Sequence, residues 1–208
     1  QISFSISQEV KFEAKKIDVT KNGNIIIAKE TNTKIPSKKI EIYSDDALYN
    51  KNEEIINFNK NVNLKDFLNN VIINSNSITY KKKEDLIYSD DETLFNIDQI
   101  YTIKSRNVTF NRKLNKIYSD ESATIKDTEE NTYILKENFV FDLNKDTIRA
   151  KSATILDSND NKYIFEDLII NSQFGFGSNK DNIINGKDEE LPFDIACTIK
   201  RQKTDMER

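Results

Sequence analysis

The sequence predicts an all-β protein, and two observations lead to that prediction. A short pattern returns along the chain: a small residue, two polar residues, and then an alternation of apolar and polar residues with the period of a β-strand. The apolar residues in these segments are mainly Ile, Val, Phe and Tyr, which favour strands. Only residues 63–70, with Leu64, Phe67 and Leu68 at helical spacing, are compatible with one short helical turn.

Five copies of the pattern organise the chain. They are AKKIDV (residues 14–19), SKKIEI (37–42), SNSITY (75–80), SRNVTF (105–110) and AKSATI (150–155). Because alternate side chains of a strand point to opposite faces, each copy predicts one apolar and one polar face. The copies begin at unequal intervals, which leaves room for further, more degenerate strands between them.

The N-terminal residues predict a strand followed by a hairpin. Residues 1–8 alternate strictly, which gives a terminal strand with one dry face. Val10 and Phe12 continue the alternation, Asn22-Gly23 favours a turn with positive φ, and apolar side chains return at Ile25 and Ile27.

Three segments share the string Ile-Tyr-Ser-Asp followed by an acid, at residues 42–46, 87–91 and 117–121. Each is expected to be a strand that runs into a turn, because Ser and Asp side chains bond the backbone just ahead of them. Since Gly and Pro are scarce, the polar cluster at residues 157–161 is also expected to form a turn. Further strands are expected at residues 55–58, 71–73, 101–103, 133–135, 139–143 and 163–170.

One elongated domain is expected over residues 1–172, followed by a C-terminal loop or strand segment over residues 173–208. The stretch at residues 174–185 contains two glycines and breaks the rhythm of the strands. The chain starts with Gln1 and shows no signal peptide, so we interpret it as a mature or trimmed segment. No apolar run approaches the roughly 18 residues of a membrane helix.

Composition argues against several classes of function. The 31 basic and 35 acidic residues are interspersed and give a net charge of −4, whereas a nucleic-acid-binding protein needs a basic stripe. The absence of histidine excludes Ser-His-Asp catalysis and histidine-ligated metals, and the single Cys197 offers one thiol to a zinc site. We therefore expect no catalytic residue, no metal and no cofactor.

Three local features permit a functional interpretation, although each has a simpler structural explanation. The acidic pairs at residues 45–46, 90–91 and 120–121 have the chemistry of calcium ligands or of solvated turns. Residues 175–178 (GFGS) are either a phosphate loop or a plain loop. Residues 81–83 (KKK) are able to meet anionic lipid head groups or sugar phosphates, or form a solvated turn.

The succession of copies points to a family. The segments SKKIEIYSD (residues 37–45), SNSITY (75–80), KNVNL (60–64), NKIYSD (115–120) and INGKD (184–188) together resemble the OstA-like repeats of the lipopolysaccharide transport proteins. That family includes LptA and the N-terminal periplasmic domain of LptD, and the likeness, which spans residues 10–188, is greatest to the LptD domain. The chain departs from the family at Lys60, where the family has glycine, and residues 191–208 show no barrel-type alternation.

The resemblance implies an elongated β-jellyroll of two facing antiparallel sheets that is open at both ends. It implies lipopolysaccharide transport and assembly at the outer membrane, a periplasmic location, no cofactor and no nucleic-acid partner. Acyl chains of lipopolysaccharide would lie in a hydrophobic slot between the sheets. The terminal edge, with Ile2, Phe4 and Ile6, would pair with other jellyroll proteins of the transport bridge, and an outer-membrane lipoprotein is a further candidate partner. Whether the protein is LptA-like or LptD-like, and whether it continues into a barrel, stays open.

Alternation alone selects ten candidate residues for the lining of the slot, each of which is equally compatible with an ordinary core residue. They are Phe12, Ile27, Ile42, Phe58, Ile73, Ile78, Val108, Phe110, Phe139 and Phe141.

Two other classes of function are compatible with the pattern. A structural or adhesive surface β-solenoid would have a closely packed interior and a regular rung length, and the unequal intervals argue against it. An enzyme such as a polysaccharide hydrolase would need two convergent acids in a cleft, and nothing singles out a pair among the 35 acidic residues.

Overall fold

All strands in the described part of the chain belong to one antiparallel sheet. The computed structural model describes residues 10–159, 161–171 and 176–177, and its sixteen strands are hydrogen-bonded into a single sheet. Over these ranges the one helical segment is the 3₁₀ helix η1 (Pro36–Lys38). The prediction of an all-β protein is therefore confirmed. The predicted strand at residues 1–8, Cys197 and most of the C-terminal segment lie outside the described residues.

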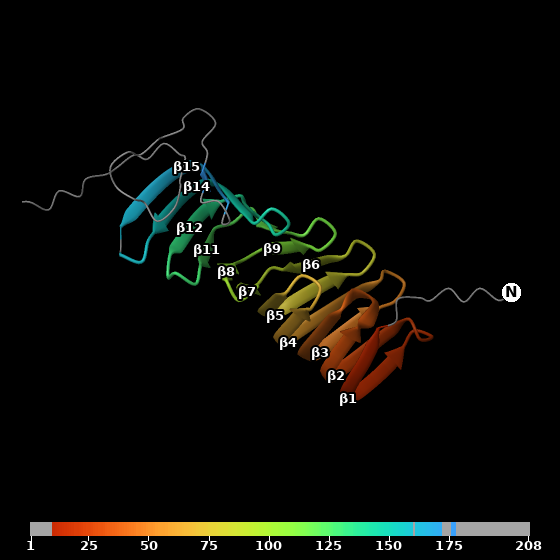
Figure 1. Cartoon of the computed structure of the whole chain (residues 1–208). Helices are drawn as coiled ribbons and strands as arrows, with labels where there is room; N and C mark the ends of the chain where they lie inside the picture. The colour runs from red at the N-terminus through yellow and green to blue at the C-terminus, as the bar shows by residue number, and fades with distance from the viewer. Residues whose placement is uncertain (1–9, 160, 172–175, 178–208) are drawn as a thin grey trace, which may run out of the picture.

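Seven strands are long and nine are short. The long strands are β1 (Lys11–Thr20), β2 (Ile25–Ile35), β3 (Ile40–Asn50), β4 (Ile55–Asp66), β5 (Val71–Lys81), β14 (Thr147–Leu156) and β15 (Lys162–Asn171). The short strands are β6 (Leu86–Ser89), β7 (Thr93–Ile97), β8 (Tyr101–Ser105), β9 (Val108–Asn111), β10 (Lys116–Ser119), β11 (Ala123–Lys126), β12 (Thr132–Glu137), β13 (Phe139–Asp142) and β16 (Phe176–Gly177). The stack is elongated, with β1 at one end and β15 at the other (Figure 1).

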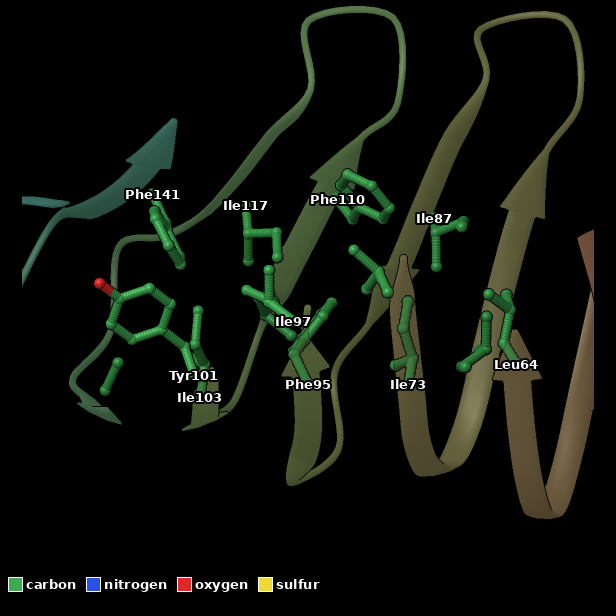
Figure 2. Close-up of a cluster of buried hydrophobic side chains, with 14 of the residues drawn as sticks. Leu64, Ile73, Ile87, Phe95, Ile97, Tyr101, Ile103, Phe110, Ile117 and Phe141 are labelled. Carbon is green, nitrogen blue, oxygen red and sulfur yellow. The ribbon is translucent and has the colours of Figure 1, made fainter. Parts of the chain in front are cut away.

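The sheet is folded back on itself along its length. Two routes of paired strands connect β5 to β14, one through β6, β9, β10 and β13 and the other through β7, β8, β11 and β12. We call them, together with the halves of the long strands that continue each route, the first arm and the second arm, and the line of bends between them the fold line. Figure 2 shows such bends at the bottom of the view, in the ribbons that carry Leu64 and Ile73.

Residues with positive φ mark the fold line on five passages of the chain: in β2, in β4, between β8 and β9, between β12 and β13, and in β15. They are Glu30, Lys60, Asn61, Asn107, Asn138 and Asp167, and the strand pairing is interrupted or shifted beside them. A non-glycine residue in this region costs free energy, so it persists only where the surrounding structure holds it. The bends are therefore imposed by the packing of the two arms.

Small side chains face the interior beside the fold line, because the two arms converge there. Ala14, Ser75, Ser105 and Ala150, which are the first residues of four sequence copies, occupy such positions. Hydroxyl groups satisfy one another at this narrow place: Ser75 and Ser89 lie 2.9 Å apart, and Thr93 donates to Ser89 at 2.8 Å. In these four copies the sequence pattern marks a bend followed by a strand, whereas the copy at residues 37–42 begins in η1.

The chain connections are regular. They start at residues 21, 36, 51, 67, 82, 98, 112, 127, 143 and 157, so that consecutive connections are 14 to 16 residues apart. The five recognised copies begin at unequal intervals because they occupy only some of these equally spaced passages, and further strands lie between them as expected.

Several local predictions are confirmed. The hairpin turn at residues 21–24 contains Gly23 with φ 88°, and the Gly23 N–H donates to the Thr20 carbonyl at 3.2 Å. At the predicted turn of residues 157–161, an Asp157 carboxylate oxygen accepts from the backbone N–H groups of Asn159 and Asn161 at 2.9 and 2.8 Å. Strands β6 and β10 end at Ser89 and Ser119, as the Ile-Tyr-Ser-Asp strings predict.

Two local expectations were wrong. The helical turn at residues 63–70 is absent, because Asp66 ends strand β4 and its carboxylate accepts from the backbone N–H groups of Leu68 and Asn69, which makes a turn. The string at residues 42–46 does not end a strand, since β3 continues through its bend to Asn50.

Candidate functional site

The interior between the arms is apolar, and most of the predicted lining residues lie in it. Eight of the ten candidates are at most 1% exposed and belong to the core: Ile42, Phe58, Ile73, Ile78, Val108, Phe110, Phe139 and Phe141. Figure 2 shows Ile97 and Ile103 of the second arm opposite Phe110 and Ile117 of the first arm. An aromatic contact also spans the arms, since Tyr101 on β8 meets Phe141 on β13 edge to face at 5.3 Å.

The remaining two candidates lie differently. Phe12 on β1 is half-buried and packs against Tyr49, with ring centroids 6.2 Å apart. Ile27 was assigned to the wrong face: its neighbours Ile26 and Ala28 pack toward the core, so Ile27 points to the opposite side of the sheet. Because residues 25–27 are all isoleucine, the sequence alone does not show which of these side chains face the core.

Sequence reasoning missed part of the interior. The additional large side chains that are at most 2% exposed include Ile56, Leu64, Tyr80, Ile87, Phe95, Ile97, Ile103, Ile117, Ile125, Leu135, Ile155 and Phe165. Alternation was sufficient to find them, because each lies an even number of residues from another inward residue of its own strand segment. The regular 15-residue interval is the signal that identifies those segments.

A buried ionic cluster joins the two arms on the side opposite the fold line. Arg112, at the first-arm turn 112–115, donates through Nε to Asp66 Oδ2 at 2.7 Å and through Nη2 to Asp66 Oδ1 at 3.1 Å. Its Nη1 donates to Asp85 Oδ1 at 2.7 Å, and its Nη2 also reaches the Lys38 carbonyl at 2.8 Å. Asp66 and Lys38 belong to second-arm turns, so Arg112 closes the folded sheet. We call this side, formed by turns 36–39, 67–70, 82–85, 98–100 and 112–115, the closing edge.

The cluster is compact and charge-balanced. Lys38 Nζ lies 2.9 Å from Asp85 Oδ2, and the Tyr80 hydroxyl donates to Asp85 Oδ1 at 2.8 Å. The side chains of Arg112, Asp66 and Asp85 are 2%, 0% and 9% exposed, so two carboxylates face one guanidinium and one ammonium group almost without water. Such a cluster specifies one arrangement of the arms, because any other leaves a buried charge unpaired.

The surroundings of Arg112, Asp85 and Tyr80 shift the pKa of each group in the direction that keeps its usual charge state. Burial acts to lower the pKa of Arg112, but the hydrogen bonds and charges of Asp66 and Asp85 outweigh burial and raise this pKa. Burial acts to raise the pKa of Asp85, but hydrogen bonds from Lys38, Arg112 and Tyr80 hold it below its ordinary value. Burial, with the nearby Asp85 carboxylate, raises the pKa of Tyr80. No local sequence pattern predicts this cluster, because its members lie up to 74 residues apart and mostly at turns.

The lysine triplet at residues 81–83 is divided by the fold. Lys82 is buried, and its Nζ lies 3.1 Å from the Tyr49 hydroxyl and 5.4 Å from the centre of the Tyr49 ring. Lys83 is exposed at the closing edge. The triplet is therefore not one continuous basic surface.

The interior is uncovered at the β1 end. Ile17 pairs with Ala28 and Val19 with Ile26, so both side chains of β1 lie on the core face, yet they are 45% and 58% exposed. Strand β1 pairs with β2 alone among the described strands, which leaves its other edge without a strand partner there. This end combines accessible apolar side chains with a strand edge that no other described strand pairs with.

An open cavity of about 640 Å³ lies beside the fold line, outside the core. Its lining is mostly polar: Asn61, Val62, Asn63, Asn74, Ser75, Asn76, Glu92, Thr93, Leu94 and Lys104. In the described part of the chain, no cluster of three or more His, Cys, Asp or Glu residues is able to hold a metal ion. No helix among the described residues is long and apolar enough to cross a membrane.

Comparisons with known proteins do not assign a family. No family model matches the chain, and a search of curated proteins finds no match.

Proposed function

We propose that this chain is a lipid-transport module that resembles the OstA-like proteins. In this proposal the folded sheet acts as an elongated jellyroll at the periplasmic side of the outer membrane. It holds the acyl chains of lipopolysaccharide between its arms and carries out no catalysis. The free strand edge pairs with neighbouring jellyroll proteins of a transport bridge, and an outer-membrane lipoprotein is a further partner.

One observation carries the proposal: the interior is continuously apolar from one end of the stack to the other. Buried side chains extend from Ala28 on β2 to Ile170 on β15, and the buried polar residues lie mainly beside the fold line, in turns or at the closing edge. An acyl chain that enters such an environment gains roughly 0.8 kcal/mol for each CH₂ removed from water. The uncovered Ile17 and Val19 place apolar surface at the β1 end, where a lipid first meets the interior.

Lipid uptake requires the arms to separate, because the side chains of the interior are almost fully buried. At the fold line the arms are joined by the backbone itself. On the opposite side, the bonds that the structure describes between turns of the two arms are mainly those of the Arg112 cluster. We therefore place the opening movement at the closing edge, with the fold line as the hinge.

The outer edge of β1, which has no strand partner among the described strands, supports the partner part of the proposal. The edge strand of a sheet is able to add a strand from another chain through its N–H and C=O groups. Residues 1–9, which precede β1, contain the predicted contact residues Ile2, Phe4 and Ile6, and these lie outside the described residues.

Native mass spectrometry with added lipopolysaccharide tests this function. We expect the purified chain to retain lipopolysaccharide after detergent removal, and the double substitution Ile17→Asp with Val19→Asp to reduce retention by charging the uncovered end. Leu48→Asp is the matched control, because Leu48 is 37% exposed on the outer face of β3. A well-folded chain that retains no lipid contradicts the proposal.

A structural role without lipid cargo is the second candidate. The closely packed interior and the regular 14 to 16 residue interval between connections are the features expected of a structural strand stack. The chain forms a meander rather than a solenoid, since consecutive long strands pair antiparallel. Absence of lipid from a folded protein in the experiment above favours this candidate.

A further inference from the structure

We propose that the closing edge carries a docking surface for an anionic phospholipid bilayer. The surface consists of four large apolar side chains at turns, together with the lysines that surround them. This inference concerns the outside of the molecule and holds whether or not the interior carries lipid.

The four apolar side chains stand in solvent. Phe67, Leu68, Ile100 and Leu114 are 57%, 60%, 48% and 56% exposed. Single exposed apolar residues are common on protein surfaces, so exposure alone carries no argument. All four, however, lie in connections between strands, where polar residues are the usual choice.

Hydrogen bonds between turns bring these residues to one side of the molecule. The Asp98 N–H donates to the Asn70 carbonyl at 3.0 Å, which joins the turn of Phe67 and Leu68 to the turn of Ile100. Arg112 binds Asp66, the residue before Phe67, and so fixes the turn of Leu114 against the same place. In the closed form of the sheet the four apolar side chains therefore lie around an ion-paired base.

The charges around this surface favour an anionic partner. Lys39, Lys65, Lys83 and Lys113 are exposed there, against the exposed acids Glu84 and Asp98, although the whole chain carries a net charge of −4. Two contacts place these lysines: the Lys39 carbonyl accepts from the Phe67 N–H at 3.0 Å, and Lys113 Nζ donates to the Lys83 carbonyl at 3.1 Å. Protruding apolar side chains with a basic surround match a bilayer, which offers hydrocarbon beneath negative head groups.

The absence of tryptophan from the sequence makes a direct test possible. In Phe67→Trp the introduced indole is the only one, so its fluorescence reports the environment of the turn. We expect a blue shift and quenching by brominated lipid on addition of phosphatidylglycerol vesicles, and no response to phosphatidylcholine vesicles alone. Tyr43→Trp is the matched control, because Tyr43 is 47% exposed on the outer face of β3, and it is expected not to respond.

Vesicle flotation tests the same surface without a probe. Phe67→Ser with Leu68→Ser removes two exposed turn side chains, and we expect binding to phosphatidylglycerol vesicles to weaken roughly tenfold or more. Lys113→Glu is expected to weaken binding several-fold, and added salt to weaken it in the wild type. Circular dichroism checks that each variant remains folded.

The possible outcomes decide the proposal. Selective insertion of the residue-67 indole, with loss of flotation in the double variant, supports it. No response to any vesicle, an equal response at residue 43, or equal binding to phosphatidylcholine overturns it, and binding only to a protein partner would then assign the surface to that partner.

Discussion

Arg112 is the side chain on which the closed form of the folded sheet most depends. Its guanidinium group makes four hydrogen bonds, to Asp66, Asp85 and the Lys38 carbonyl, and it is 2% exposed. We expect Arg112→Ala to lower the free energy of unfolding by about 3–5 kcal/mol, because two buried carboxylates lose their main partner. Urea denaturation measures this loss.

A matched control separates this effect from the loss of any arginine. Arg149 is exposed on β14, so Arg149→Ala is expected to change the free energy of unfolding by no more than about 0.5 kcal/mol. Equal stability of the Arg112 and Arg149 variants would show that the cluster does not hold the arms together.

Because the pKa of Asp85 is lowered in the folded chain, the free energy of unfolding is expected to decrease at acid pH. Hydrogen bonds from Lys38, Arg112 and Tyr80 outweigh burial and lower the pKa of Asp85 in the folded chain. Its contribution is therefore complete above the ordinary aspartate pKa of about 3.9, and it is lost as the pH falls through the lower folded-state pKa. Asp85→Asn is expected to flatten this acid-side decline in urea denaturation at a series of pH values.

The pH series with Asp85→Asn also has an outcome that would contradict this assignment. An unchanged decline in Asp85→Asn would assign the acid sensitivity to other carboxylates. Asp90→Asn, at an exposed position beside the fold line, serves as the control.

At the residue scale, the sequence was sufficient for the apolar interior and insufficient for the ionic cluster. Alternation placed Phe58 and Phe110 correctly, because a strand has two faces and only one is dry. Alternation failed at Ile27, because three consecutive isoleucines do not show which of them faces the interior. The Arg112 cluster depends on how distant turns meet after the sheet folds, which no local pattern encodes.

Bends, rather than strands, are the elements that give this fold its form. The sequence revealed the strands, and it also contained the bends as small residues such as Ser75, Ser105 and Ala150, but their meaning emerges only from the folded sheet. A strand without a bend would have room for a larger side chain at these positions. The regular spacing of the connections was likewise hidden, since only some bends begin with Ala or Ser.

A larger side chain at Ala150 tests whether the interior between the two arms is narrow beside the fold line. Ala150 is 5% exposed and pairs with Leu168 beside the positive-φ residue Asp167. We expect Ala150→Leu to lower the free energy of unfolding by about 1–3 kcal/mol, because the converging arms leave no space for a larger side chain. Lys151→Leu, at the exposed neighbouring position, is the control for urea denaturation. Equal tolerance at both positions would contradict convergence of the arms at this bend.

The whole molecule is a linear stack, so local stability is expected to vary along it. Each strand contacts mainly its neighbours. Among the described strands β1 pairs with β2 alone, and its core-face side chains Ile17 and Val19 are exposed. Hydrogen exchange followed by mass spectrometry should therefore show faster exchange in β1 than in β4 and β5. Protection of β1 equal to that of β5 would mean that another chain or segment covers its edge.

The central claim is that acyl chains lie between the arms, and site-specific photocrosslinking tests it most directly. A photoreactive phenylalanine analogue replaces Phe110, which faces the interior, or Thr109, which faces outward on the same strand. After incubation with lipopolysaccharide and irradiation, we expect a lipid adduct at position 110 and none at position 109. Equal labelling at the two positions, or no adduct at position 110 in a folded protein that still binds lipopolysaccharide, would contradict the account.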